Sequence, residues 1–294
     1  MKIVFLNGGF ANQIFQYIFY RYAQIKAPGE EWYLDDSFFF VHNIHNGYEL
    51  EKIFGLYPSL LSRYFDPDVW QYMIDMKRKQ NKSIPQMLLE NGIDIRMISE
   101  SDNWRHWNSF SGACDELQGA GFYPEIVKRQ GEIYYHGYWL TSEWFHAVEN
   151  EVRSELVFPE IDEPHNTEYM DKIQCSESCS IHIRRGDYVS MGFSVADSVY
   201  LNEVRDMLNN VPDITLFVFS DDMDYCRTHA HDMGLDLPKE TVYVEGNRGN
   251  MAYRDLQLMS HCKNMINGNS SFCYLAALLN TDLEGIINPT GRKL

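Results

Sequence analysis

The stretch Ser180–Tyr188 reads SIHIRRGDY, an apolar run that ends in charged residues and a glycine. Apolar residues occupy alternate positions up to Ile183, as on a β-strand. Two arginines, a glycine and an aspartate follow, which indicates a strand ending in a tight turn. Ligands of open parallel α/β sheets bind beyond the carboxyl ends of the strands. Arg184 and Arg185 therefore suit a phosphate, whose oxygens accept paired hydrogen bonds from a guanidinium. The alternative is a surface salt bridge between Arg185 and Asp187.

Strands and helices are expected to alternate, most regularly in the second half of the chain. Such alternation predicts parallel sheets covered by helices. Phe158–His165 carries two prolines among acidic residues and is the predicted linker between an N-terminal domain, residues 1–160, and a C-terminal domain, residues 161–294. The sheets of the two domains are expected to face a central cleft. The expected first-half elements are strands at Ile3–Asn7, Trp32–Asp35 and Ile133–Trp139, and helices at about Asn12–Ile25 with Asn12 as N-cap, at Pro67–Lys79, at Ser83–Asn91 and at Ser142–Leu156.

Composition excludes several classes of protein. The 294 residues carry a net charge of −17, whereas a general nucleic-acid binder needs a broad basic surface. The six cysteines show no metal-binding spacing. No run approaches the ~20 apolar residues of a membrane span, and the N-terminus lacks a signal-peptide pattern, so a cytoplasmic protein is expected. The basic run at Lys77–Lys79 allows at most peripheral contact with the inner face of a membrane.

Two further strand ends carry polar clusters. The strand Ile214–Phe219 runs into Ser220, Asp221 and Asp222, and the strand Asn264–Asn267 is followed by Ser270 and Ser271. Carboxylates suit a ribose or a guanine edge, and hydroxyls at a helix start suit an anion. The alternatives are helix capping by Ser220, Asp221, Ser270 or Ser271, and a metal held by Asp222 and Asp224. Together these ends form the inventory of a nucleotide diphosphate site.

The chain resembles the bacterial α-1,2-fucosyltransferases of glycosyltransferase family 11. The family's sequence blocks occur here in the family's order and cover nearly the whole chain. The chain departs from the family pattern at Cys273–Leu278 and at Phe193 and Ser194. The blocks are GGFANQIFQYIFYRYA from Gly8, GYWLTSEWF from Gly137, HIRRGDY from His182, FVFSDD from Phe217 and LMSHCKNMINGNSSF from Leu258.

The resemblance implies a fold of the GT-B type, with two Rossmann-like domains. It also implies inverting transfer of L-fucose from GDP-β-L-fucose to the 2-hydroxyl of a terminal β-galactoside. The acceptor would be a galactose-containing oligosaccharide or lipid-linked glycan, as in surface polysaccharide or blood-group-H-like synthesis. No metal or other cofactor is expected. In this reading the N-terminal domain is on the acceptor side and the C-terminal domain binds GDP-fucose.

The motifs also carry residue roles. Arg184 would bind the β-phosphate and stabilise the departing GDP, with Asp187 as a second catalytic residue, although Arg185 and Asp187 could instead brace the turn. The implied donor-binding residues are His182, Arg184, Arg185, Asp221, Ser270, Ser271 and Phe272. The implied donor or acceptor loop contains Gly8, Gly9, Asn12 and Gln13. A general base could come from Asp35, Asp36, His42 or His45. The alternative for each of these residues is a purely structural role.

Two rival functions remain at this point. One is transfer of a different sugar, or formation of a different linkage, on the same scaffold. The other is a non-catalytic protein that binds a nucleotide or a sugar.

Overall fold

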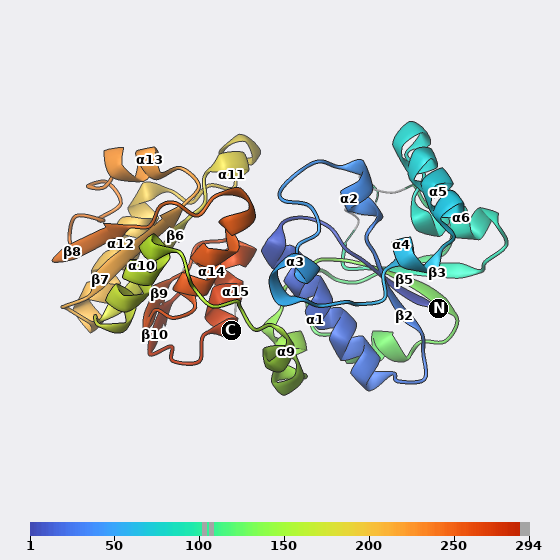
Figure 1. Ribbon diagram of the computed structural model, residues 1–294, viewed down its shortest axis with the longest axis horizontal. Helices are drawn as coiled ribbons and strands as arrows, with labels where there is room; N and C mark the ends of the chain where they lie inside the picture. The colour runs from blue at the N-terminus through green and yellow to red at the C-terminus, as the bar shows by residue number, and fades with distance from the viewer. Residues whose placement is uncertain (102–104, 106–108, 289–294) are drawn as a thin grey trace. The chain divides into compact units, whose positions relative to one another are not determined.

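The computed structural model describes residues 1–101, 105 and 109–288. The chain divides into two compact units, unit 1 at Met1–Val157 and unit 2 at Phe158–Leu294. Each unit contains a five-stranded parallel sheet with helices packed against it (Figure 1). The predicted α/β fold with two parallel sheets is therefore confirmed.

The sheet of unit 1 has the strand order β2-β1-β5-β3-β4, with β5 at its centre. Every neighbouring pair is parallel. The elements of unit 1 are β1 Lys2–Phe5, α1 Phe10–Lys26, β2 Trp32–Asp35, α2 Ser37–Val41, α3 Leu50–Phe54, α4 Leu61–Tyr64, α5 Pro67–Gln80, α6 Ile84–Glu90, β3 Ile95–Ser99, β4 Cys114–Glu116, the 3-10 helix η1 Pro124–Lys128, β5 Glu132–His136, α8 Ser142–His146 and α9 Glu149–Glu155.

Aromatic side chains build much of the core of unit 1. On one face of the sheet, Phe19 of α1 stacks on Trp139 with ring centroids 4.0 Å apart and meets Trp144 of α8 edge-on at 5.0 Å. On the other face, Phe5 and Tyr134 pack with side chains of α2, α5 and α6 in one buried cluster. Both faces of the parallel sheet are therefore covered, as parallel sheets require.

The sheet of unit 2 has the strand order β10-β9-β6-β7-β8, which places β6 at its centre. All of its neighbouring pairs are parallel. The elements of unit 2 are α10 Pro164–Gln174, β6 Ser178–Ile183, α11 Gly186–Met191, α12 Asp197–Asn210, β7 Thr215–Ser220, α13 Met223–Thr228, β8 Glu240–Tyr243, the 3-10 helix η2 Gly249–Met251, α14 Tyr253–Met259, β9 Asn264–Ile266, α15 Ser271–Leu279 and β10 Gly285–Ile287.

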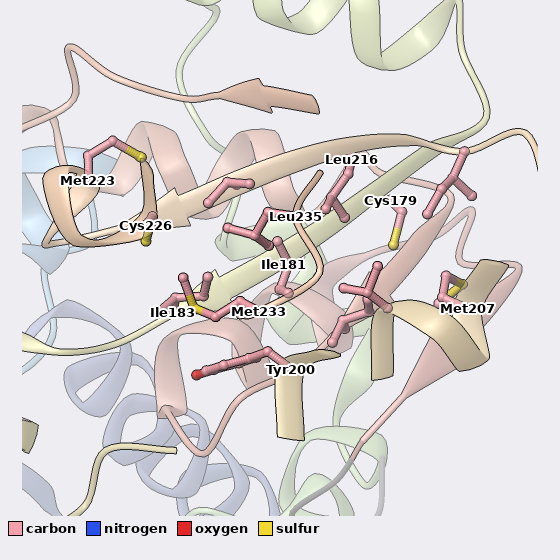
Figure 2. Close-up of a cluster of buried hydrophobic side chains, with 14 residues drawn as sticks. Cys179, Ile181, Ile183, Tyr200, Met207, Leu216, Met223, Cys226, Met233 and Leu235 are labelled. Carbon is pink, nitrogen blue, oxygen red and sulfur yellow. The ribbon is translucent and has the colours of Figure 1, made fainter. Parts of the chain in front are cut away.

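The alternation along β6 divides its side chains between two cores. Ile181 and Ile183 pack with Tyr200 and Met207 of α12 and with Leu216 of β7, as Figure 2 shows. The intervening residue His182 faces the opposite layer, where its ring stacks on that of Phe272 in α15. The period-2 pattern that predicted the strand therefore also separates its core residues from its polar ones.

Several element boundaries differ from the predicted ones. Helix α1 begins at Phe10 with Gly9 as N-cap, so the prediction that Asn12 caps it is wrong. The helix predicted over Ser142–Leu156 is two short helices, α8 and α9, interrupted at Ala147 and Val148. No helix among the described residues is long and apolar enough to cross a membrane.

Candidate functional site

The carboxyl ends of β9, β6 and β7 lie side by side in unit 2. Ile183 at the end of β6 pairs with Ser220 of β7, and Ile181 pairs with Ile266 of β9. Arg184, Asp221 and Asn267 each follow directly in sequence, so they leave the sheet at the same edge. The structure thus brings the three polar strand ends together, as parallel pairing of these strands requires.

Arg184 is held between two carboxylates at this edge. Its Nη1 lies 2.8 Å from Oδ2 of Asp221 and its Nη2 lies 2.7 Å from Oδ1 of Asp187. The Arg184 side chain keeps 31% of its surface exposed. A guanidinium has five N–H donors, so two carboxylate contacts do not exhaust it. The arrangement therefore fixes the direction of an accessible cation.

The turn after β6 allows this close approach. Asp221 Oδ1 accepts a 2.8 Å hydrogen bond from the backbone N–H of Arg185. A side chain at Gly186 would clash with Oδ2 of Asp221 and would come within 4.0 Å of the Arg184 guanidinium carbon. The glycine of the RRGD stretch is therefore required because the Asp221 carboxylate packs against the backbone there.

Arg185 points to a different partner from the predicted one. Its guanidinium carbon lies 3.2 Å from the centroid of the Tyr225 ring, and its Nε lies 3.6 Å from Oδ2 of Asp222. The Tyr225 hydroxyl donates to Asp197 of α12 over 2.7 Å. The alternative pairing of Arg185 with Asp187 is therefore wrong: Asp187 pairs with Arg184, and Arg185 packs onto α13.

His182 is buried beneath this cluster. Its ring centroid lies 5.5 Å from that of Phe272, in a stacked arrangement. Burial, with a further contribution from the Arg184 charge, lowers the pKa of His182 to about 3. The imidazole is therefore neutral at physiological pH, and its buried Nδ1 has no hydrogen-bond partner among the described residues.

The third strand end combines a helix cap with a buried amide. Ser270 Oγ accepts from the backbone N–H of Phe272 over 3.2 Å and caps α15, as one sequence alternative expected, with Ser271 as the first residue of the helix. Asn267 is 1% exposed, and neither polar atom of its amide finds a partner among the described residues. Asn269 donates to the carbonyl oxygen of Phe193 over 2.6 Å.

Asp222 is the cap of α13. Its Oδ1 accepts from the backbone N–H of Tyr225 over 3.1 Å, whereas Ser220 Oγ donates to the Ile183 carbonyl oxygen over 2.7 Å. The cap is therefore neither Ser220 nor Asp221. Among the described residues there is no group of three or more His, Cys, Asp or Glu side chains that could hold a metal ion.

The glycine loop predicted as a donor or acceptor contact belongs to unit 1. Gly8 has a φ of +78°, and a side chain there would collide with that of Asn12. The Gln13 amide donates to the carbonyl oxygens of Gly8 and Gly47 and accepts from the backbone N–H of Glu49. Gln13 is therefore occupied in joining this loop to the segment before α3, and Gly9 lies near His45.

The candidate general bases also lie in unit 1. Asp35 accepts from the Tyr134 hydroxyl over 2.6 Å, and Asp36 accepts from the backbone N–H and the hydroxyl of Ser62. Burial raises the pKa of Asp36 to about 6. Burial, aided by the Lys77 charge, lowers the pKa of His42. Asp35 and Asp36 therefore have hydrogen-bond partners within unit 1, and His42 lies close to Lys77 of the same unit.

Two further residues complete the cluster in unit 2. Tyr225 supports Arg185, and Gly186 admits the Asp221 carboxylate. Asp222, named from the sequence as part of the strand-end cluster and as a possible metal ligand, pairs with Arg185. Tyr225 gives no signal in the sequence, because its ring meets Arg185 only through the turn between β7 and α13.

Comparisons with known proteins find a matching family model and related glycosyltransferases. A family model described as "Glycosyl transferase family 11" matches residues 116–290, more than half of the chain. An alpha-1,2-colitosyltransferase from Escherichia coli is 26% identical over 97% of this chain and 90% of that protein. The O-antigen biosynthesis glycosyltransferase WbnK, also from Escherichia coli, is 25% identical over 96% of this chain and 91% of that protein.

A solved structure shows the same fold. The fucosyltransferase NodZ from Bradyrhizobium aligns with a TM-score of 0.53 at 13% sequence identity, covering 100% of this chain and 96% of that one. The similarity spans both units and confirms the fold class expected from the sequence motifs.

Proposed function

Because the chain belongs to glycosyl transferase family 11, we propose that it transfers L-fucose from GDP-β-L-fucose to the 2-hydroxyl of an acceptor glycan. The chain is a glycosyltransferase by family, and the donor, the linkage and the acceptor are the proposal. Transfer proceeds with inversion at the fucose anomeric carbon. Unit 2 binds the donor and unit 1 binds the acceptor.

One observation carries the donor assignment: the Arg184 guanidinium at the carboxyl end of the central strand β6. When the bond from fucose to GDP breaks, negative charge builds on the β-phosphate oxygen. A cation already fixed in place stabilises that charge without reorganisation during the reaction. Asp187 and Asp221 supply the fixation through their ion pairs with Arg184. Both are therefore assigned to positioning Arg184.

The remaining donor contacts are assigned to the start of α15, to the stacked pair of His182 and Phe272, and to Arg185. Ser270 and Ser271 stand at the start of α15, where the positive end of the helix dipole favours phosphate oxygens. Phe272 and the neutral His182 form a stacked pair beside them and are assigned to the nucleoside. Arg185, stacked on Tyr225, adds a second positive charge near the phosphates.

The two arginines also bear on metal dependence. A divalent ion at a nucleotide-sugar site coordinates the diphosphate oxygens, and the guanidinium groups of Arg184 and Arg185 can donate hydrogen bonds to those oxygens instead. Asp222, the residue from which a metal site would start, caps α13 and pairs with Arg185. We therefore expect GDP-fucose to be used without a metal.

The acceptor is proposed to end in a β-galactoside, on an oligosaccharide or a lipid-linked glycan. The name of WbnK places that relative in O-antigen biosynthesis, which supports a role in surface polysaccharide assembly for this chain. Such an acceptor would bring the protein to the inner face of the membrane as a peripheral partner.

A second donor is favoured by a specific observation. The E. coli relative that is 26% identical is a colitosyltransferase, and colitose is the 3-deoxy form of fucose. A site that accepts one sugar therefore needs little change to accept the other. The alternative function is transfer of colitose, or another sugar, from its GDP-linked donor on the same scaffold.

The test is a matrix of donors and acceptors with the full-length chain. GDP-fucose, GDP-colitose, GDP-mannose and UDP-galactose are each incubated with several β-galactosides, with and without EDTA. Nucleotide release is measured, and the product linkage is assigned by NMR. We expect release from GDP-fucose that requires a galactoside, resists EDTA and yields an α-1,2-linked product.

Each of the other outcomes supports one of the rival functions. Faster turnover with GDP-colitose than with GDP-fucose would mean that colitose is the transferred sugar. A product with another linkage would mean that the acceptor is not modified at its 2-hydroxyl. GDP binding without turnover under any acceptor would support the non-catalytic alternative.

A further inference from the structure

The strand order of the sheet in unit 2 reverses between β6 and β9. From β6 the chain continues to β7 and β8 on one side, and it then returns to place β9 and β10 on the other side. Ligands of open α/β sheets bind at such a reversal, outside the carboxyl ends of the strands. Here the reversal lies between Arg184 and Arg185, which follow β6, and Asn267 and Gly268, which follow β9.

Tyr200 of α12 reaches this edge of the sheet from inside the core. Its ring packs in the apolar cluster with Ile181 and Ile183, and the residue is only 2% exposed. Figure 2 shows the hydroxyl end of the ring on the side of Ile183, where β6 ends, and away from Cys179, near the start of the strand. A buried ring therefore carries this hydroxyl to the carboxyl end of β6.

Gly268 lies directly beside the Tyr200 hydroxyl. A side chain at Gly268 would place its Cβ 3.5 Å from the hydroxyl oxygen and 3.0 Å from the carbonyl oxygen of His182. Glycine is the residue that leaves room where a ligand must come close to the backbone. The glycine after β9 therefore keeps the space in front of the hydroxyl open.

The Tyr200 hydroxyl is accessible and has no partner. It makes no hydrogen bond to a described residue, and its oxygen is not among the unpartnered atoms that are sealed from solvent. The small exposed area of Tyr200 therefore includes this oxygen. Burial raises the pKa of Tyr200, so the hydroxyl keeps its proton, and the charge of Arg185 acts on the same group. An O–H donor beside a guanidinium suits an anionic oxygen.

We propose that the Tyr200 hydroxyl donates a hydrogen bond to the diphosphate of the nucleotide-sugar donor, between the ends of β6 and β9. A diphosphate has several anionic oxygens, so it can accept hydrogen bonds from Tyr200 and from Arg184 at the same time. This assignment rests on the proposed function, because the ligand is a GDP-linked sugar only if the chain uses one as its donor.

The experiment measures the binding of GDP and of guanosine by calorimetry with the full-length chain, so it needs no turnover. Tyr200→Phe removes the hydroxyl and keeps the buried ring. Gly268→Ala fills the space in front of the hydroxyl. Tyr169→Phe is the matched control, because the Tyr169 hydroxyl belongs to α10 and donates to the carbonyl oxygen of Tyr243 on the edge strand β8 over 3.4 Å.

We expect Tyr200→Phe to weaken GDP binding about 10-fold, the scale of one hydrogen bond to a charged group, and to leave guanosine binding unchanged. Its thermal unfolding midpoint should not fall, because the hydroxyl has no partner among the described residues. Gly268→Ala should weaken GDP binding at least as much, and Tyr200→Phe should add little to it in the double variant. Tyr169→Phe keeps the wild-type affinity for GDP.

Wild-type affinity for GDP in Tyr200→Phe would overturn the proposal. An equal loss of GDP and guanosine binding would also overturn it, because the hydroxyl would then act on the nucleoside or on the fold. If Gly268→Ala fails to fold, Tyr200→Phe decides alone. Weaker GDP binding by Tyr200→Phe, in a chain whose wild type transfers no fucose, would support the assignment and contradict only the proposed function.

Discussion

The carboxyl-end edges of the two sheets carry carboxylates in contrasting environments. In unit 2, Asp187 and Asp221 are partly exposed and paired with Arg184. In unit 1, Asp36 and Glu100 are buried, and their hydrogen bonds come from backbone N–H groups and a hydroxyl. The comparison shows that the same sheet edge uses its carboxylates in two ways. In unit 2 they fix the direction of a partly exposed arginine, and in unit 1 they accept hydrogen bonds that hold the surrounding chain.

Glu100 illustrates the environment in unit 1. Its Oε2 accepts from the backbone N–H groups of Tyr138 and Trp139, both at 2.7 Å. Trp139 is fully buried and adopts a φ of +56°, which is rare for a bulky residue. The two hydrogen bonds help to hold that backbone, so Glu100 acts on structure, whereas the carboxylates of unit 2 pair with the Arg184 cation.

Removing the cation should have the largest effect. In Arg184→Ala we expect turnover with GDP-fucose to fall roughly 100- to 1,000-fold, as when one transition-state donor is lost. The thermal unfolding midpoint should stay close to that of the wild-type chain, because the side chain is partly exposed. Arg205→Ala, an exposed arginine on α12, is the control for general charge loss. Turnover within a few-fold of wild type would refute the role of Arg184.

Glu100→Gln should change the pH dependence of stability. Burial raises the pKa of Glu100 from 4.5 to about 7, so between these values the folded state holds a proton that the unfolded chain releases. The wild-type residue therefore contributes most stability below pH 4.5 and loses it as pH rises through 7. Relative to Glu100→Gln, the free energy of unfolding of the wild type should fall by roughly 3 kcal/mol over that interval.

Denaturant unfolding of both proteins at pH values from 4.5 to 8 gives this difference directly. Asp36 and Asp255 also have raised pKa values, but they are present in both proteins and cancel. If the free energy of unfolding depends on pH in the same way in both proteins, Glu100 has an ordinary pKa, and the carboxylates of the two units do not differ as described.

The same carboxylate-to-amide change in unit 2 should alter function instead. Asp221→Asn weakens one side of the Arg184 clamp and should lower kcat about tenfold, the scale of one charge-assisted hydrogen bond. Stability should change by less than about 1 kcal/mol, because the ion pair is partly exposed. Steady-state kinetics and denaturant unfolding on one preparation measure both. A large loss of stability with unchanged kcat would mean that Asp221 belongs to the scaffold.

Secondary structure in unit 2 was largely predictable because its strands are buried and its helices have apolar stripes. The stretch Trp32–Asp35 in unit 1 was also predicted with its observed bounds. Helix α11 was not foreseen, since none of its residues is buried and it lacks an apolar period. The strand β3 lies in a segment of short helices whose pattern gave no clear period.

The site was predictable in part. The Arg, Asp and Ser positions could be identified because each follows closely after an apolar run that predicts a strand. The partners of each side chain were not predictable: which arginine pairs with Asp187 depends on the turn at Gly186, and the packing of Tyr225 on Arg185 depends on where α13 lies.

Binding of GDP and of guanosine to the full-length chain, measured by calorimetry, tests the central claim most directly, because the ratio of the two affinities isolates the diphosphate. We predict that the wild-type chain binds GDP much more tightly than guanosine, that Arg184→Ala loses most of that preference, and that Arg205→Ala keeps it. Equal preference for GDP in Arg184→Ala and the wild type would contradict the claim that the arginine at the end of β6 binds the donor diphosphate.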